Sequence, residues 1–502
     1  MSKDNKSYGQ ILKSSSVVGG AQAITMLIGI AQTKFVAVFL GPVGVGLAGT
    51  FGSVLGITGR LAGLGVSGSA VRQIAEANAS NDREKLGKTV TTLRWLCWCT
   101  GLLGAVALAV FAKPVSQLTF GTDEYWWAIA ILSVVVLIRR IQNGQMAYIQ
   151  GLRRIGDLAK LKIIGALAGL TVGVGLYAWL GLRGIVPAIV ALAVVDLVFS
   201  WYYARRVNTP VERVSRKEFF DLSSDFVKLG VVRMWAGLLS AVVAYTTRAM
   251  IINRLDLHAA GIYQSAYRIS GMFVGFILAA MSADFYPRLT GLADDNLKVR
   301  RLVNEQTEIG LLLAVPGLLA TVTAAPWIIS ILYTSEFNMS GELLKWFVLG
   351  CLGRVISWPM GVILLAKGCK GWLFLLETTA NALHVGLIWI GLNNFGVIGV
   401  SYAFALLYVF HIVAVMLISY RVSGFKWSWE VVKMLLTFIP ATAVVITSSL
   451  LMEDLPATIV GGVLTFFVGL YCTRKLSLRL DENHKINRMI GKIPWVKRLT
   501  AK

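Results

Sequence analysis

Acidic side chains are scarce in this sequence. Its 502 residues include 26 Asp and Glu against 48 Lys and Arg, and charged residues of both signs make up only 15% of the chain, whereas soluble proteins average about 25%. Hydrophobic residues reach 56%, and the mean hydropathy is +0.69. This composition excludes an ordinary soluble domain and indicates a polytopic membrane protein.

Cysteines and catalytic motifs are also scarce. The five cysteines have neither metal-ligand spacing nor the pattern of a secreted disulfide framework. The sequence shows no phosphate loop, catalytic triad or metal-ligand cluster, and its Gly-x-Gly patterns lack the strand–turn–helix setting of a nucleotide site. The N-terminus has no short apolar core followed by a cleavage site, so we expect no cleaved signal peptide. We therefore expect a protein that is not an enzyme and holds no metal or cofactor.

Long apolar runs, by contrast, are abundant. Runs of about 20 apolar residues, the length that spans a bilayer as a helix, recur between short polar breaks. They predict an all-α polytopic membrane fold with about fourteen transmembrane helices, at residues 14–39, 46–69, 92–112, 125–149, 159–180, 184–203, 227–250, 260–286, 306–332, 343–366, 372–392, 397–419, 429–450 and 456–472.

The polar breaks differ sharply in charge. When they are assigned alternately to the two sides of the membrane, the inside segments hold about 34 Lys and Arg and the outside breaks about 3. This asymmetry predicts that both termini are cytoplasmic, and that most of the net charge of +22 serves topology and attraction to anionic headgroups. The outside breaks, such as 41–46 and 181–184, are too short for an active site, which argues against an integral polymerase or ligase.

An internal echo predicts two lobes. The stretches "TKFVAVFLGPVGVGL" (33–47) and "TTRAMIINRLDLHAAGIY" (246–263) each place a Thr–cation pair late in a helix, then a short turn, then a glycine that opens the next helix. Transporters are often built from such repeats. We therefore predict an N-terminal six-helix lobe at 1–217, a C-terminal six-helix lobe at 218–427, an additional helix pair at 428–472 and a basic cytoplasmic tail at 473–502, lying along the inner membrane surface.

Cations outnumber acids inside the predicted spans. The cations are Lys34, Arg60, Arg139, Arg140, Arg233, Arg248, Arg268 and Arg354, whereas the acids well inside are Asp196 and Glu377. Ionisable residues at such depth usually face a cavity and mark a substrate path. Because these cations cannot all pair, and because guanidinium groups bind phosphate and stay charged when buried, we expect them to line a cavity for an anionic cargo. The same surplus argues against an exporter of cationic drugs.

The neighbouring arginines raise a question of direction. Side chains at adjacent helical positions point about 100° apart, so Arg139 and Arg140 cannot both face the same way. We expect one to face the lumen and the other to find a partner between helices, such as Asp196. The nearby amides favour Arg139 for the lumen.

Two further sets of residues leave alternatives open. Lys34 and Arg248 fit cavity cations, and they also fit side chains that extend to headgroups at the outer surface. Glu377, Asn381 and His384 share one helical face. That face fits a coupling site for H+ or Na+, and it equally fits a hydrogen-bonded structural face.

The stretches "TKFVAVFLGPVGVGL" and "RLAGLGVSGSAVRQIAE" give the sequence a family resemblance. They resemble the Wzx-type polysaccharide flippases, in the polysaccharide transporter branch of the MOP superfamily, through the Lys late in the first helix, the following turn and the end of the second helix. "GLRRIGD" (151–157) resembles the family's short turn after the fourth helix. The topology covers the whole chain, whereas the specific motifs cover mainly the first 80 residues.

The resemblance implies a V-shaped pair of lobes that works by alternating access. Its cargo would be an undecaprenyl-pyrophosphate-linked oligosaccharide, moved across the bacterial inner membrane for O-antigen or related surface polysaccharide, with a polymerase and a chain-length regulator as partners. Lys34 carries over as a cavity cation because its motif matches, whereas Arg60, Arg139 and Arg140 rest on the charge argument alone. A lipid II-type flippase, a MATE-like ion-coupled exporter and a non-transporting scaffold are the alternatives.

Overall fold

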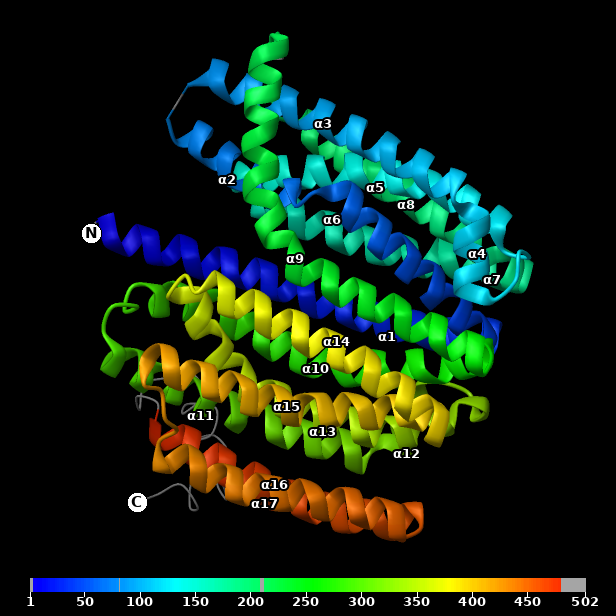
Figure 1. The fold of residues 1–502 in the computed structure, drawn as a ribbon, viewed down its shortest axis with the longest axis vertical. Coiled ribbons are helices and arrows are strands. Elements are labelled where there is room, and N and C mark those ends of the chain that lie inside the picture. The colour runs from blue at the N-terminus through cyan, green and yellow to red at the C-terminus, as the bar shows by residue number, and fades with distance from the viewer. Residues whose placement is uncertain (1–2, 81, 208–211, 480–502) are drawn as a thin grey trace. The chain divides into compact units, whose positions relative to one another are not determined.

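The computed structural model describes residues 3–80, 82–207 and 212–479, and in these ranges the chain is helical with no strand (Figure 1). The predicted all-α fold class is therefore confirmed. The α-helices are α1 (Lys3–Gly63), α2 (Val66–Ala79), α3 (Arg83–Val110), α4 (Ala112–Phe120), α5 (Trp126–Gly151), α6 (Ile155–Ala168), α7 (Val174–Leu180), α8 (Ile185–Arg205), α9 (Arg216–Arg254), α10 (Leu257–Thr290), α11 (Asn296–Thr323), α12 (Ala325–Leu332), α13 (Met339–Ala366), α14 (Lys370–Phe395), α15 (Ile398–Ser423), α16 (Trp429–Leu451) and α17 (Asp454–Arg479).

Twelve helical stretches of the described chain are long and apolar enough to cross a membrane, so the protein is a multi-pass membrane protein. Two of them, Gly20–Gly63 with 44 residues and Ile155–Arg205 with 51, are about twice the length that one crossing needs. Each is interrupted by a glycine in the left-handed region, Gly41 (φ 60°) and Gly181 (φ 56°), and the predicted outside breaks begin at these two glycines. The count of fourteen crossings stays a prediction.

One predicted helix is broken where the sequence pattern shows no break. The span expected at 46–69 ends at Gly63, and α2 begins only at Val66. Between them Leu64 (φ 47°) and Gly65 (φ 67°) are both left-handed, a conformation that cannot continue a right-handed helix. Residues 61–66 around the break are all apolar or glycine, so hydropathy alone could not reveal the interruption.

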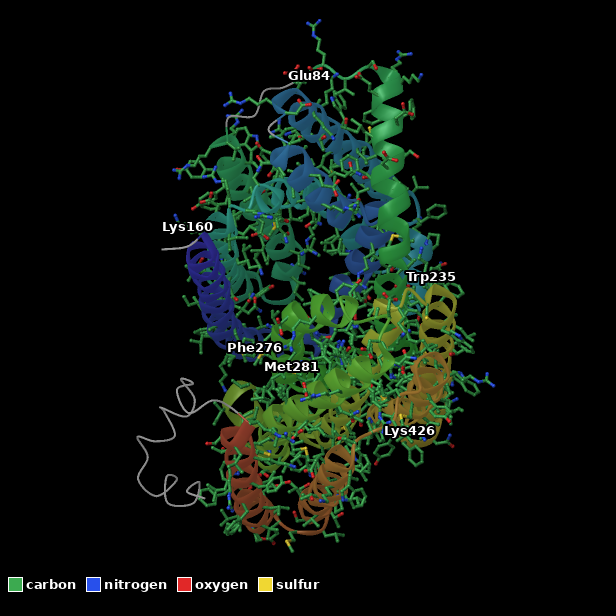
Figure 2. The ribbon with its side chains drawn as sticks, turned by 90° about the vertical axis from the view of Figure 1, so that its left-hand side faces the viewer. Glu84, Lys160, Trp235, Phe276, Met281 and Lys426 are labelled. Carbon is green, nitrogen blue, oxygen red and sulfur yellow. The ribbon has the colours of Figure 1, made fainter. Side chains whose placement is uncertain are left out.

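The first packing unit comprises residues 1–261 and therefore includes α9, which the sequence placed in the second lobe. Helix α9 packs on α1, α2 and α4, and Ser69 of α2 donates a 2.7 Å hydrogen bond to the Phe226 carbonyl of α9. Glu84 lies at the start of α3 (Figure 2). Lys88, one turn further along, forms ion pairs with Glu84 at 2.8 Å and with Glu218 of α9 at 2.9 Å. These contacts explain why the observed division falls after Gly261 and not at 217.

The second unit begins at Ile262 and runs to the end of the described residues at Arg479. It is organised around α13, which packs on α11, α14 and α15. Phe285, Met360, Val415 and Phe425 are among the buried residues of its core. The helices expected as an additional pair are α16 and α17, and both pack on α11. The proposed surface segment of the basic tail from residue 480 onward lies outside the described residues.

Candidate functional site

The neighbouring arginines of α5 have opposite environments. Arg140 is only 3% exposed, and its guanidinium donates from Nη2 to the Gly63 carbonyl at 3.3 Å and from Nη1 to Ser67 Oγ at 3.5 Å. Gly63 is the last residue of α1, whose carbonyl end carries partial negative charge. Arg140 therefore satisfies the end of α1 at the Leu64–Gly65 break, and in this conformation it offers almost no surface to a cargo.

Arg139, by contrast, is exposed. Its charge acts on Asp196 of α8, which also accepts a hydrogen bond from Gln142 one turn further along α5. Asp196 lies against α6, where a Cβ added to Gly165 would stand 2.6 Å from its carboxylate oxygen. Asp196 therefore interacts with Arg139, whereas Arg140 finds its partners at Gly63 and Ser67.

The other predicted cations of the first unit lie on α1 and α9. Arg60 is exposed on the last turn of α1, with its guanidinium 3.8 Å from the position of a Cβ on Gly237 of α9. Lys34 is half-buried on α1. Arg248 is buried on α9, with Nη1 bonded to the Ala244 carbonyl. The side chain of Arg233 lies outside the described residues.

The echoed stretches match in local structure. The hydroxyls of Thr33 and Thr247 each donate a hydrogen bond to the backbone carbonyl four residues earlier, at 2.8 and 2.7 Å. The two glycines also lie in tight backbone contact, because a Cβ on Gly46 would stand 2.4 Å from the Leu257 carbonyl and one on Gly261 only 1.9 Å from the Pro42 carbonyl. Glycine at both positions is what allows this close approach.

Arg354 is the most distinctive predicted cation of the second unit. Helix α13 is the most buried of the twelve candidate spans, with 72% of the residues in its 18-residue apolar stretch buried. Between Ser340 and Leu364, all of which the structure describes, Arg354 is nevertheless the only exposed residue. Ionisable side chains at such a depth usually face a bundle interior or an aqueous cavity and mark a substrate path.

Arg268 of α10 is likewise exposed. Its charge acts on Tyr333, which lies between the helical spans. Burial raises the pKa of the Tyr333 phenol and the nearby Arg268 partly offsets this rise, so that the pKa is about 12.

The polar face of α14 lies near the helix that bears Tyr408. Glu377, Asn381 and His384 are all half-buried, and Asn381 donates to the Glu377 backbone carbonyl at 2.7 Å. Both Glu377 and Arg354 act electrostatically on Tyr408 of α15. Sequence reasoning missed Tyr408, because nothing in the α15 pattern distinguishes it from other interfacial aromatics. Among the described residues no three His, Cys, Asp or Glu side chains gather as metal ligands.

Comparisons with known proteins identify the family of the chain. Residues 35–341 match the profile of the family described as "Polysaccharide biosynthesis protein". The chain is 21% identical over 411 residues to the "Lipid III flippase" of Escherichia coli (strain K12), covering 80% of this chain and 95% of that protein.

Two solved structures share the fold. The "Lipid II flippase MurJ, inward closed conformation" superposes with a TM-score of 0.71 at 12% identity, over 93% of this chain and 99% of that one. A "multidrug resistance MATE family transporter of the MOP superfamily" in its inward-facing conformation superposes with a TM-score of 0.64 at 16% identity, over 80% of this chain and 96% of that one. These likenesses confirm the predicted MOP fold.

The matched family profile covers more than half of the 502 residues. The similar proteins are flippases and transporters, which confirms the expectation that the chain is not an enzyme. The resemblance to polysaccharide flippases is confirmed as well. The chain belongs to the polysaccharide biosynthesis protein family, with the fold of the MOP superfamily of membrane transporters.

Proposed function

We propose that this protein moves undecaprenyl-pyrophosphate-linked oligosaccharide repeat units from the cytoplasmic to the outer leaflet of the bacterial inner membrane, for O-antigen or a related surface glycan. It would do so by alternating access, with both termini in the cytoplasm. Membership in a polysaccharide biosynthesis family and similarity to a Lipid III flippase support the cargo class. The polymerase and chain-length regulator of the glycan would act beside it.

The observation that carries the proposal is the exposure of Arg354 on an otherwise buried helix. An arginine at such a position is costly in a membrane protein unless it serves a ligand. Its guanidinium suits a pyrophosphate, because it stays charged and can form two parallel hydrogen bonds. The polyprenyl chain would remain in lipid while the charged group and sugar pass through the protein.

The other predicted cations take related roles in this proposal. Arg139 and Arg60 in the first unit, and Arg268 in the second, are exposed on helices of the candidate spans, and each would bind the anionic part of the cargo. Lys34 and Arg248 would support the cavity charge. Arg140 would act indirectly, through the end of α1 that it holds.

Transport would be coupled to a gradient of H+ or Na+. Glu377 and His384 are the proposed coupling groups, with Asp196 beside Arg139 as a second acid. Glu377 and Arg354 both interact electrostatically with Tyr408, which supports a link between the coupling acid and the cargo cation.

A leaflet assay with purified protein tests the proposal. Proteoliposomes would contain lipid-linked oligosaccharide with a fluorescent sugar label, and a membrane-impermeant quencher would report the label in the outer leaflet. We expect Arg354→Gln to slow transfer at least about tenfold, the equivalent of one lost charged hydrogen bond. Arg183→Gln, which alters an exposed arginine in a short turn, is the control and should transfer at the wild-type rate.

The same vesicles separate the alternatives. Faster transfer of lipid II than of the oligosaccharide would identify a lipid II-type flippase, and movement of cationic drugs with no lipid transfer would identify a MATE-like exporter. Absence of any transfer by the folded protein would favour a scaffold. Dissipating the H+ or the Na+ gradient in turn would identify the coupling ion, and Glu377→Gln should remove that dependence.

A further inference from the structure

The first unit contains a cavity of about 710 Å³ that involves none of the predicted cargo residues. It is formed by α3, α5 and α8, with α5 packed against both of the others (Figure 1). Its volume falls in the range of about 300–1,000 Å³ that ligand pockets occupy. The greater part of its lining is apolar and includes Leu93, Leu137, Ile138, Ile141, Leu197 and Val198.

The cavity also has two cations and no acid. Arg94 of α3 and Arg205 of α8 both line it, together with no Asp or Glu. Within the described part of the chain neither guanidinium has an ion pair; instead Arg205 lies 3.5 Å over the Trp201 ring centroid and Arg94 5.8 Å over that of Tyr148. Cation–π contact holds a guanidinium by its face and leaves its N–H groups for an anion. The cavity is therefore electrostatically complementary to one phosphate group.

The rim of the cavity has the character of a membrane interface. Trp98 (52% exposed) and Trp201 (47%) both line it, and tryptophan is enriched at the level of lipid headgroups. Further along α3 and α8, Leu102 (54%) and Val198 (52%) expose apolar side chains suited to hydrocarbon. Arginines beside the tryptophans and an apolar slot beyond them match the two parts of a phospholipid.

We propose that this cavity binds one anionic glycerophospholipid of the surrounding bilayer. The phosphate would lie between Arg94 and Arg205, and an acyl chain would fill the apolar slot. Apart from its arginines, tryptophans and Tyr148, the lining offers a single amide, Gln145, for hydrogen bonding. That is too little for an oligosaccharide, so the cavity fits a small headgroup and not the glycan cargo.

The bound lipid would also support the packing around Arg140. Cys97 lines the cavity, and its thiol interacts with Arg140. The lipid would fill the space that α3, α5 and α8 line. It would act as a structural ligand of the first unit, independent of the cargo.

Native mass spectrometry of the full, delipidated chain tests this inference. Dioleoylphosphatidylglycerol is titrated against dioleoylphosphatidylcholine, and we expect one molecule of the anionic lipid to bind preferentially. Arg94→Gln/Arg205→Gln should weaken its binding about 30-fold, the effect expected from two lost cations at a membrane surface. Arg206→Gln is the matched control, because this neighbouring arginine lies over Tyr202 and does not line the cavity.

Two further variants separate charge from space and guard against misfolding. Arg94→Lys/Arg205→Lys keeps both charges and should retain most of the binding, whereas Val198→Trp fills the slot and should reduce it with the arginines intact. Equal binding of the two lipids, or unchanged binding by the double Gln variant, would overturn the proposal. Displacement by equimolar undecaprenyl phosphate would assign the cavity to the carrier lipid instead, and displacement by inorganic phosphate alone would reduce it to an anion site; either result also overturns it.

Discussion

Replacement of Arg140 should destabilise the protein, whereas replacement of its neighbour Arg139 should not. Arg140→Ala leaves the Gly63 carbonyl at the end of α1 without its side-chain donor. It also opens space beside Gly101, where an added Cβ would stand 3.4 Å from Arg140 Cγ. Arg139 is exposed, so its truncation removes little packing. The two variants differ by one position in the sequence and test whether structure and transport are divided between them.

The expected magnitude follows from opposing terms. A hydrogen bond to a charged group contributes about 1.5–3 kcal/mol, and an orphaned buried carbonyl costs about 1–3 kcal/mol. Part of this loss is recovered, because removing a buried cation removes its desolvation penalty. A net loss of about 2–3 kcal/mol in the free energy of unfolding would lower the midpoint by roughly 4–12 °C in a unit of this size. Arg140→Met refills the space and should lose only about 1 kcal/mol.

Two measurements on the same preparations check this reasoning. Thermal unfolding in detergent should rank the midpoints as Arg139→Ala near wild type, Arg140→Met slightly lower and Arg140→Ala lowest. In the leaflet assay, by contrast, Arg139→Ala should transfer the lipid more slowly than wild type although its unfolding midpoint is unchanged. An unchanged midpoint for Arg140→Ala, or a larger drop for Arg139→Ala, would refute the assignment of Arg140 to the end of α1.

Three other predictions concern contacts within each unit. Gly65→Ala should lower the unfolding midpoint, because Gly65 has φ 67° and a Cβ there would stand 2.0 Å from the Gly230 carbonyl oxygen; the left-handed backbone alone costs about 1–2 kcal/mol. Glu308→Gln should expose the end of α17 to protease, because the buried Glu308 carboxylate accepts two 3.1 Å hydrogen bonds from Arg479 Nη2. Since Arg479 is exposed, this ion pair contributes only about 1–3 kcal/mol to stability. Acidification should loosen the start of α9. The hydrogen bond from Lys88 and those from Ser215 hold the pKa of Glu218 at about 2. The stability that Glu218 contributes is therefore fully present above the pKa of an unfolded Glu, about 4.3, and is lost as the pH falls through about 2. Hydrogen exchange, corrected for intrinsic rates, measures this loss.

Each of these predictions has a matched control in the chain. A Cβ on Gly68, in the same helix α2, meets nothing within 4 Å, so Gly68→Ala should leave the midpoint unchanged or raise it. Glu305 pairs only at the surface with Arg301, four residues earlier, so Glu305→Gln should leave protease sensitivity as it is. Lys88→Met should shrink the acid-dependent step at α9, because only the bonds from Ser215 then lower the pKa of Glu218. If these controls behave like the test variants, the contacts are not the cause.

The helical architecture followed from the sequence because a bilayer imposes it. Every backbone group in hydrocarbon needs an internal partner, so long apolar runs such as 343–366 could only be helices, and α13 covers that stretch. The breaks predicted to lie outside were visible because Gly41 and Gly181 stand in them, where the backbone has a positive φ. The break at Leu64 was not visible, since the residues on both sides of it continue the apolar pattern.

The sequence by itself determined that this protein is a multi-pass membrane protein with more cations than acids in its spans, because composition and hydropathy are properties of the chain alone. Only the tertiary structure decided which arginine is buried, since burial of Arg140 depends on the end of α1 and on α3, far away in the chain. It likewise decided that Asp196 interacts electrostatically with Arg139 and that Arg94 and Arg205 line one cavity. The direction of a side chain is set by the helices that pack around it, and those neighbours come from distant parts of the sequence.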